Sequence, residues 1–290
     1  MKSKTKQRLT ILFFLSPWLI SFLIFGLYPI LFSIYVSFTK YSGINPTMEF
    51  VGLKNYIHAF QDETFLIALK NTFIFVIGTI PFTIGIAVLI AILLNTYKKG
   101  SGIFKAGFFL PSVISMVVIS MIWIYLYSSN GFFNTIISFL GMHVDQRSFL
   151  ANQKTALISI MIMDVWAAFG YYVILVFAGL QNIPDSVYEA AKIDGANPRQ
   201  VAFKITLPML KPTLFFVISI NTIRSFQIFS EIYTMTGGGP QNATQTVVHY
   251  LYQVSFNKFQ MGYGSAISYI LFIIIMTITL VQKRVLRSDY

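Results

Sequence analysis

The chain has 290 residues, of which 56% are hydrophobic and only 11% are charged. Soluble domains carry about 25% charged residues, so this composition excludes an ordinary soluble domain and indicates a membrane protein. A net charge of +11 would suggest nucleic-acid binding in a soluble protein. Here the basic residues border apolar segments, where they orient the chain and meet acidic groups of membrane lipid, and no nucleic-acid partner is expected. The absence of cysteine excludes disulfides and thiolate metal sites.

Six apolar stretches are each long enough to cross a bilayer, which takes about 20 residues. The first follows a basic N-terminus, as in a signal peptide. It exceeds the roughly 7–15 apolar residues of such peptides and lacks a small-residue cleavage site, so we expect a retained helix. The sequence predicts an all-α polytopic membrane protein with a single transmembrane domain over residues 1–290 and a core at about 68–282. The six predicted spans are 11–38, 68–95, 106–128, 154–180, 211–234 and 263–282.

Lysine and arginine are distributed unequally between the predicted connecting segments. Fourteen lie on the side of the N-terminus and six lie on the other side. Cytoplasmic loops are enriched in these residues, so both termini are predicted to be cytoplasmic. The fourteen lie in residues 1–10, 96–105, 181–211 and 283–290.

One polar loop after the fourth span contains helix signals rather than linker composition. Ser186 and Glu189 have the spacing of a capping box, and Gly195 is a suitable C-terminal stop for the helix that follows. Asn197 and Pro198 then predict a second helix start, which Pro208 and Pro212 are expected to end. These patterns predict a cytoplasmic helix–glycine–helix hairpin. The residues alone leave two alternatives open, a docking site for a partner or an amphipathic segment resting on headgroups.

Several spaced motifs resemble those of a known family. Glu189-Ala190-Ala191, with Gly195 four residues further on and then Ile205-Thr206-Leu207-Pro208, resembles the signature of membrane subunits in binding-protein-dependent ABC importers. Over nearly the whole chain the resemblance is closer still, to maltose-type sugar permeases. It is carried by Phe50 to Tyr56, Asn71-Thr72, Leu110-Pro111, Gly237 to Pro240 and Gly262 to Ala266.

The resemblance implies a type I ABC importer permease core with six transmembrane helices. It also implies that residues 183–208 form the cytoplasmic coupling-helix loop, which docks on an ATPase subunit. The residues expected to carry that coupling are Glu189, Ala190, Ala191, Asp194 and Gly195.

Three charged residues, Asp164, Arg224 and Glu231, fall inside apolar stretches. A charge at a helix centre costs about 2.5–3.5 kcal/mol on insertion scales, so such residues normally face a cavity or a partner. In a continuous helix Arg224 and Glu231 would share a stripe but lie about 10 Å apart, too far for an easy direct pair. Two interpretations remain open. Either the charges neutralise one another or pair with a second permease, or they line a solute path.

The resemblance favours the solute path, because maltose-type permeases place sugar contacts on these two helices. It implies eight substrate contacts in this chain. Asp164, Arg224 and Ile228 depart from the amides and small residues that the family often has there. Arg224 suggests the hypothesis of an acidic oligosaccharide, since a planar guanidinium group fits carboxylates or phosphates. The eight positions are Asp164, Ala167, Ala168, Tyr171, Asn221, Arg224, Ser225 and Ile228.

Motifs for catalysis and nucleotide binding are missing from the sequence. No G-x-x-x-x-G-K-[ST] occurs, so ATP and Mg²⁺ are expected on a partner ATPase and no cofactor is expected in this chain. His58, His143 and His249 have no metal-ligand spacing, so no metal site is expected. Neither G-x-S-x-G nor H-E-x-x-H appears, and the chain is predicted not to be an enzyme.

The leading hypothesis is a permease subunit of an ATP-driven carbohydrate importer in a prokaryotic cytoplasmic membrane. Its partners would be a second, homologous permease in a heterodimer, ATP-binding cassette subunits and an extracytoplasmic solute-binding protein. A rival is an ion-coupled secondary transporter that uses the three intramembrane charges, although the inverted repeats of such proteins are not evident. A second rival is a membrane-embedded enzyme acting on lipid-linked sugars, which would need an acid/base pair that the sequence does not show.

Overall fold

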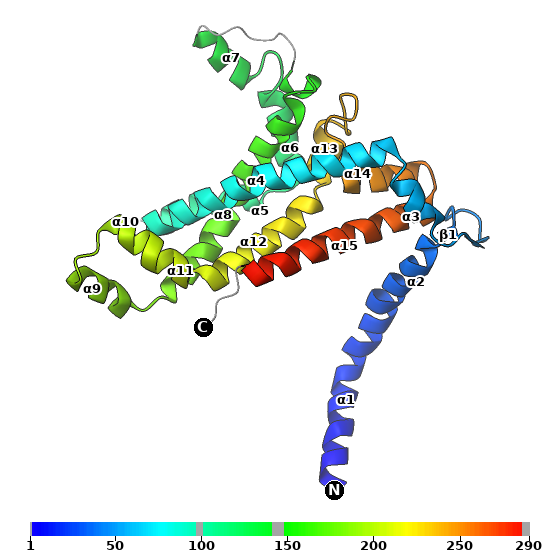
Figure 1. Cartoon of the computed structure of the whole chain (residues 1–290), viewed down its shortest axis with the longest axis horizontal. Helices are drawn as coiled ribbons and strands as arrows, with labels where there is room; N and C mark the ends of the chain where they lie inside the picture. Colours follow the sequence, from blue (N-terminus) through cyan, green and yellow to red (C-terminus); the bar gives the residue numbers. More distant parts are fainter. Residues whose placement is uncertain (1, 97–100, 141–147, 286–290) are drawn as a thin grey trace. The chain divides into compact units, whose positions relative to one another are not determined.

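The computed structural model describes residues 2–96, 101–140 and 148–285. His143 lies outside the described residues, as do Lys98, Lys99, Arg147 and Arg287, which are among the basic residues counted above. The described residues form helices joined by turns and loops, together with one two-stranded sheet (Figure 1). It forms two compact units, which are described separately. Unit 1 comprises Met1–Asp62 and Leu251–Ile270, and unit 2 comprises Glu63–Tyr250 and Leu271–Tyr290.

Unit 1 begins with a long helical segment and continues into a small sheet. The helical segment consists of α1 (Lys2–Phe22), the π-helical turn η1 (Leu23–Leu27) and α2 (Tyr28–Ser37). Strands β1 (Thr39–Lys40) and β2 (Glu49–Phe50) pair antiparallel, with Thr39 opposite Phe50. Helix α3 (Lys54–Ala59), the π-helical turn η4 (Gln253–Asn257) and the first part of α15 (Met261–Val285) complete the unit.

The motif at residues 50–56 stabilises unit 1 through side-chain hydrogen bonds. The Asn55 amide donates to the carbonyls of Ser37 and Thr39, both at 2.9 Å, and so holds the end of α2 against α3. The Tyr56 hydroxyl lies 2.7 Å from Ser37 Oγ. Gly262 lets α15 approach closely, because a Cβ there would meet the Thr39 carbonyl. The residues that carried the family resemblance therefore tie α2, α3 and α15 together.

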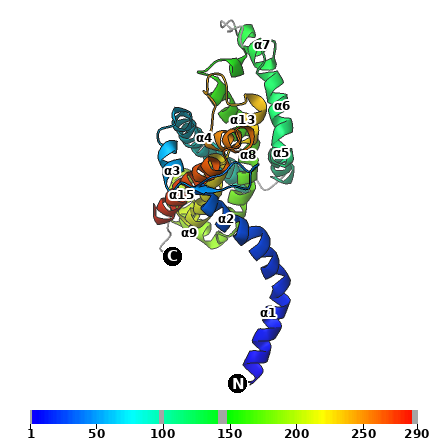
Figure 2. The same cartoon turned by 90° about the vertical axis from the view of Figure 1, so that its right-hand side faces the viewer.

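Unit 2 consists of long helices joined by short ones. The long helices are α4 (Glu63–Thr96), α8 (Ala156–Gln181), α12 (Lys211–Phe226) and the remainder of α15. Helix α5 (Ser101–Val113) is followed by α6 (Met116–Leu126) and α7 (Phe132–Phe139) (Figure 2). The shorter elements are η2 (Phe149–Ala151), α9 (Asp185–Ile193), α10 (Pro198–Gln200), η3 (Val201–Thr206), α11 (Leu207–Met209), α13 (Ser230–Met235) and α14 (Val247–Tyr252), the last of which ends in unit 1.

The core of unit 2 is the packing of α4, α5 and α12 against α8. Tyr172, Val173 and Val176 on α8 are almost fully buried, and Ala87 on α4 is fully buried against this cluster. Gly170 lets α5 lie directly on α8, since a Cβ there would meet the Phe108 carbonyl. Small residues at such contacts are typical of membrane helices, whose association depends on close backbone approach.

Five helical segments are long and apolar enough to cross a membrane, within the described residues. They are Thr10–Ser37, Glu63–Thr96, Ala156–Gln181, Lys211–Met235 and Met261–Val285. The remaining predicted span, 106–128, is bent by 93° between α5 and α6, and it makes a sixth span only if this pair crosses the bilayer as one. Pro111 and the extended backbone of Ser115 (ψ 131°) interrupt the helical hydrogen bonds there.

Candidate functional site

The fifth predicted span is broken rather than continuous. Helix α12 ends at Phe226 and α13 starts at Ser230, with Phe229 outside the helical region at φ −143° and ψ −57°. The break turns Glu231 back towards α12, and Arg224 Nη2 lies 3.7 Å from Glu231 Oε1. The expectation that about 10 Å along a straight helix would separate these side chains is therefore wrong.

Arg224 pairs with two carboxylates from two other helical segments. Its Nη2 donates a hydrogen bond of 2.8 Å to Asp164 Oδ1 on α8 and lies near Glu231 on α13. Only 3% of the Asp164 side chain and 9% of the Glu231 side chain are exposed, against 34% for Arg224. Arg224 and Asp164 thus form the ion pair that the first interpretation expects, and whether the cluster also lines a solute path stays a prediction.

A small cavity of about 190 Å³ opens beside this cluster, among α4, α8, α12 and α13. Four of the eight predicted substrate contacts line it, and no residue between Ala167 and Asn221 does so. Sequence reasoning missed Phe75, Gln227 and Ser230, which reach the cavity through the helix break or through packing of α4. The lining residues are Phe75, Asp164, Arg224, Ser225, Gln227, Ile228, Phe229, Ser230 and Glu231.

The other four predicted contacts have different surroundings. Ala167 and Ala168 are buried in the two hydrophobic clusters of unit 2. Tyr171 is 41% exposed on α8, and its ring meets that of Tyr172 at 5.3 Å. Asn221 is buried on α12, one turn before Ser225, whose hydroxyl lies 3.4 Å from its Oδ1. Solute contact by any of the eight residues stays a prediction.

Two buried donors near the cluster lack an acceptor within the described part of the chain. They are Nη1 of Arg224 and Nδ2 of Asn221. A buried donor without an acceptor costs about 1–3 kcal/mol, so most buried polar groups in proteins are paired. These two N–H groups can therefore donate to oxygen atoms of another molecule; Arg224 lines the cavity, whereas Asn221 does not.

The polar loop forms the predicted hairpin, with one difference at its start. Helix α9 begins at Asp185, one residue before the predicted cap, and its N-cap position is Pro184 without a side-chain cap. The prediction of a capping box at Ser186 and Glu189 is therefore wrong, because the helix already starts after Pro184, whose backbone is extended (ψ 137°). Gly195 ends the helix as predicted: its φ is +73°, and the N–H of Ala196 donates to the Ala191 carbonyl at 3.0 Å.

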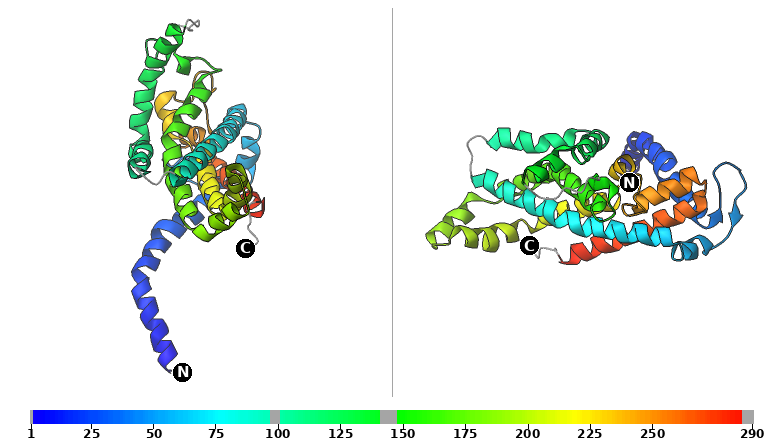
Figure 3. Two further views of the ribbon diagram at one scale, coloured as in Figure 1. Left: turned by 90° about the vertical axis from the view of Figure 1, so that its left-hand side faces the viewer. Right: turned by 90° about the horizontal axis from the view of Figure 1, so that it is seen from above.

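The second helix of the hairpin starts as predicted and ends later. Asn197 Oδ1 accepts from the Gln200 N–H at 2.9 Å, and the Gln200 side chain returns a bond of 2.8 Å to the Asn197 N–H. Pro208 lies inside the continuing helical segment, near the start of α11, so it does not end the helix. Figure 3 shows the hairpin in yellow-green at the end of unit 2 where α4, in cyan, terminates.

Four of the five predicted coupling residues are accessible on this hairpin. Glu189, Ala190, Asp194 and Gly195 are exposed, whereas Ala191 is 5% exposed and packs inward. Their contact with an ATPase stays a prediction.

At the opposite end of α4, a glycine-rich loop is held by side-chain hydrogen bonds. The Asn71 amide donates to the carbonyls of Asn242 and Gln245 at 2.9 and 3.0 Å, and Thr72 Oγ1 accepts from the Val247 N–H at 3.0 Å. Gly238 has φ +88°, and a Cβ on it would meet the Gln245 side chain. The glycines thus allow the sharp bend of this loop.

Comparison with known proteins identifies the family. Residues 83–287 match the family of binding-protein-dependent transport system inner membrane components. The chain is 38% identical over 285 residues to the probable ABC transporter permease protein YesP of Bacillus subtilis (strain 168), covering 97% of this chain and 91% of the relative. It is 35% identical over 275 residues to the arabinooligosaccharides transport system permease protein AraP of the same bacterium, covering 93% and 86%.

A solved structure has the same fold. One chain of a bacterial ABC transporter involved in the import of the acidic polysaccharide alginate superposes with a TM-score of 0.85 at 23% identity, covering 98% of this chain and 97% of that chain. The predicted fold class, the core of an ABC importer permease, is confirmed. The chain belongs to the family of inner-membrane components of binding-protein-dependent transport systems, the permease subunits of ABC importers.

Proposed function

We propose that this chain is a carbohydrate permease subunit that forms half of a solute pathway. The observation that carries the proposal is the polar cavity at Asp164, Arg224 and Glu231, inside helices that can span a membrane. A volume of about 190 Å³ is below the roughly 300 Å³ at which ligand pockets usually begin, so it suits one sugar unit of a longer chain. The remainder of the site would come from a second permease.

The charge of the cluster supports a neutral oligosaccharide. Arg224 is the cation on which the acidic-solute hypothesis depends, and it is already engaged by Asp164 and Glu231. A carboxylate on the solute would have to compete with Asp164 and Glu231 for this guanidinium. Hydroxyl groups, in contrast, can accept from Nη1 of Arg224, a residue that lines the cavity and whose Nη1 has no acceptor in the described part of the chain. The oligosaccharide in the name of AraP is consistent with this solute class.

Coupling to ATP hydrolysis would use the hairpin. In this proposal both termini are cytoplasmic. The hairpin contacts an ATP-binding cassette subunit, which holds ATP and Mg²⁺. The contact residues are Glu189, Ala190, Ala191, Asp194 and Gly195. An extracytoplasmic protein delivers the solute on the other side. The exposed, glycine-terminated shape of α9 supports this role, because a short rigid helix can transmit a push from a partner.

Reconstitution of the whole importer tests the proposal against the ion-coupled rival. Vesicles would contain this chain, its partner permease and the ATPase, with the external binding protein outside. We expect uptake of a radiolabelled oligosaccharide that requires ATP inside and is unaffected by collapse of proton or sodium gradients. Uptake that follows an ion gradient without ATP would establish the secondary transporter instead.

Calorimetric titration of the external binding protein tests the solute class. We expect heat on addition of neutral oligosaccharides and none with uronic-acid oligomers of equal length. Tight binding and uptake of the uronic-acid oligomers alone would overturn the neutral assignment.

A further inference from the structure

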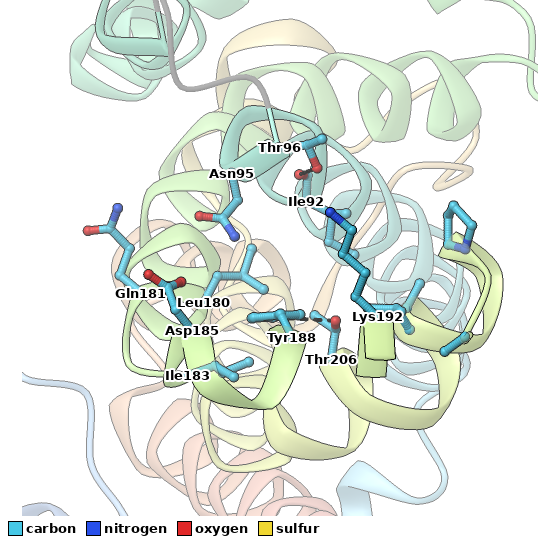
Figure 4. Close-up of a pocket in the computed structure, with 14 residues that line it drawn as sticks. Ile92, Asn95, Thr96, Leu180, Gln181, Ile183, Asp185, Tyr188, Lys192 and Thr206 are labelled. Atoms are coloured by element: carbon cyan, nitrogen blue, oxygen red, sulfur yellow. Dashed lines mark hydrogen bonds between the residues drawn. The ribbon is translucent and has the colours of Figure 1, made fainter. Parts of the chain in front are cut away.

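A second and larger cavity lies away from the intramembrane charges. Its volume is about 650 Å³, within the usual range for ligand pockets. It is enclosed by the C-terminal ends of α4 and α8 together with the hairpin (Figure 4). Ile92, Leu180 and Ile183 give it an apolar side, and polar side chains of the hairpin and helix ends give it the other side. The cavity is therefore amphipathic.

The face of α9 that lines this cavity differs from the face predicted to meet an ATPase. Asp185, Tyr188 and Lys192 line the cavity at positions i, i+3 and i+7 of the helix, which share one side. Glu189 and Ala190 are exposed and do not line it. The cavity-lining side chains Asp185 and Lys192 are exposed as well, so they are accessible to a ligand of their own.

The cavity presents a cation and an anion that are not paired with each other. Lys192 and Asp185 form no ion pair within the described ranges, and the side chains of Asn95 and Gln181 form no hydrogen bond there. Figure 4 shows the Lys192 amino group directed into the cavity towards Thr96, and Asp185 beside Gln181 and Asn95. A ligand that carries both a negative and a positive group matches this arrangement.

The position of the cavity along the spans points to the membrane surface. Helix α4 has 34 residues, a length of about 51 Å at 1.5 Å per residue, which exceeds a hydrocarbon core of about 30 Å. The predicted spans 68–95 and 154–180 end at the cavity, whose lining includes Asn95, Thr96 and Gln181. Helix α8 also ends at the cavity, at Gln181. The cavity thus lies where spans leave the apolar layer and phospholipid headgroups begin.

We propose that this cavity binds the headgroup of an aminophospholipid. Lys192 binds the phosphate, Asp185 binds the ammonium group, and the glycerol and first acyl carbons contact Ile92, Leu180 and Ile183. Asn95 and Gln181 donate to the remaining phosphate and ester oxygens. The proposal does not depend on the solute that the permease transports.

Native mass spectrometry of the assembled importer, purified in mild detergent, tests the proposal. The complex would be exchanged into detergent containing phosphatidylethanolamine, phosphatidylglycerol or phosphatidylcholine. We expect retained phosphatidylethanolamine, and about fivefold less of it in Lys192→Gln, the loss expected for one lysine near a membrane surface. Lys192→Arg should restore retention. Lys204→Gln is the matched control, because Lys204 is an exposed cation of the same hairpin that does not line the cavity.

Further variants and a soluble probe make the test decisive. Asp185→Asn should remove the preference for phosphatidylethanolamine over phosphatidylglycerol, and Ala202→Trp should reduce retention by filling the cavity without changing either charge. Equal retention in Lys192→Gln, Ala202→Trp and Lys204→Gln would overturn the proposal. So would displacement of the lipid by millimolar O-phosphoethanolamine, since that would assign the cavity to a soluble phosphate compound. None of these readouts involves transport, so they stand apart from the proposed function.

Discussion

At the scale of single residues, Arg224 joins α12 to both α8 and α13 through two carboxylates. Arg224→Gln would leave Asp164 and Glu231 buried without a counter-charge, and removal of one partner from a buried ion pair costs about 3–5 kcal/mol. We therefore expect a lower unfolding temperature for this variant of the assembled importer, measured by thermal unfolding in detergent.

A double variant separates the ion pair from a general loss of packing. Arg224→Gln combined with Asp164→Asn removes one of the two orphaned carboxylates, so it should unfold at a higher temperature than Arg224→Gln alone. A double-mutant cycle gives the interaction energy directly. Unchanged unfolding of Arg224→Gln would show that the pair contributes nothing to the fold.

His249 is a second residue whose charge state affects the fold, and it lies outside the spans. Its side chain is 2% exposed, and Nδ1 lies 2.8 Å from Gln245 Oε1. Burial lowers the pKa of His249 below its usual value of 6.5. The unfolded chain therefore takes up a proton at a higher pH than the folded chain does. The stability from neutral His249 is complete above about pH 6.5 and is lost as the pH falls towards the lowered pKa.

The pH dependence of unfolding checks this assignment. We expect the unfolding temperature to decrease between about pH 7.5 and about pH 5.5, and to decrease less in His249→Gln, which cannot titrate. The other titratable groups are the same in both proteins, so their contributions to the pH dependence cancel when the two unfolding profiles are compared. Identical pH profiles would show that His249 does not titrate differently on unfolding.

At the scale of elements, the turn of the hairpin depends on one backbone conformation. Gly195 has φ +73° and its N–H donates to the Lys192 carbonyl at 3.2 Å. Proline cannot adopt this φ and has no N–H to donate, so its substitution here should cost about 3 kcal/mol of stability. Gly195→Pro should therefore abolish oligosaccharide uptake while ATP hydrolysis continues. Gly195→Asn is the control, because asparagine tolerates positive φ. Full uptake in Gly195→Pro would contradict the coupling role.

The contact between α5 and α8 makes a second prediction at this scale. A Cβ at Gly170 would meet the Phe108 carbonyl, whereas a Cβ at Gly85 on α4 would meet nothing within 4 Å. Gly170→Ala should lower stability by about 1–3 kcal/mol through overpacking, and Gly85→Ala should be neutral or raise it by up to about 1 kcal/mol. Protease resistance of the two variants in detergent measures the difference, and equal resistance would show that α5 can move aside.

Some of these elements could be predicted from local sequence and others could not. The Asn197 cap and the Gly195 stop follow from side-chain and backbone chemistry within a few residues. The break after Phe226 could not be predicted, because Gln227, Ile228 and Phe229 include neither proline nor glycine. Packing and the ion pairs of Arg224 stabilise the break, and those depend on residues of α8 that are about 60 positions away in the chain.

At the scale of the whole molecule, hydropathy and charge predict the number and orientation of the spans. Since the chain has no cysteine, single cysteines report topology without background. Asn45→Cys and Ser186→Cys both place a thiol at an exposed position. We expect a membrane-impermeant maleimide to label Asn45→Cys in intact cells and to label Ser186→Cys only after permeabilisation. The reverse pattern would invert the proposed orientation.

The partition into two compact units had no signal in the sequence, which is apolar throughout and contains no linker. The partition depends on which helices contact one another, and the hydrophobic periodicity of the sequence does not specify those contacts. The single-domain interpretation remains a prediction about how the permease folds and moves. The cavity at the hairpin likewise could not be predicted from the sequence. Ile92, Leu180 and Lys192 belong to no motif, and they line one cavity only because α4, α8 and α9 come together in the fold.

The helix break between α12 and α13 has an evolutionary consequence. Because the break brings Glu231 and Asp164 to the same guanidinium, a substitution at any one of the three positions changes the requirements on the other two. A descendant that replaces Arg224 by a neutral side chain is expected to have already replaced at least one carboxylate. In an alignment of related permeases, positions 164, 224 and 231 should therefore covary as a triplet, although a straight helix would keep positions 224 and 231 apart.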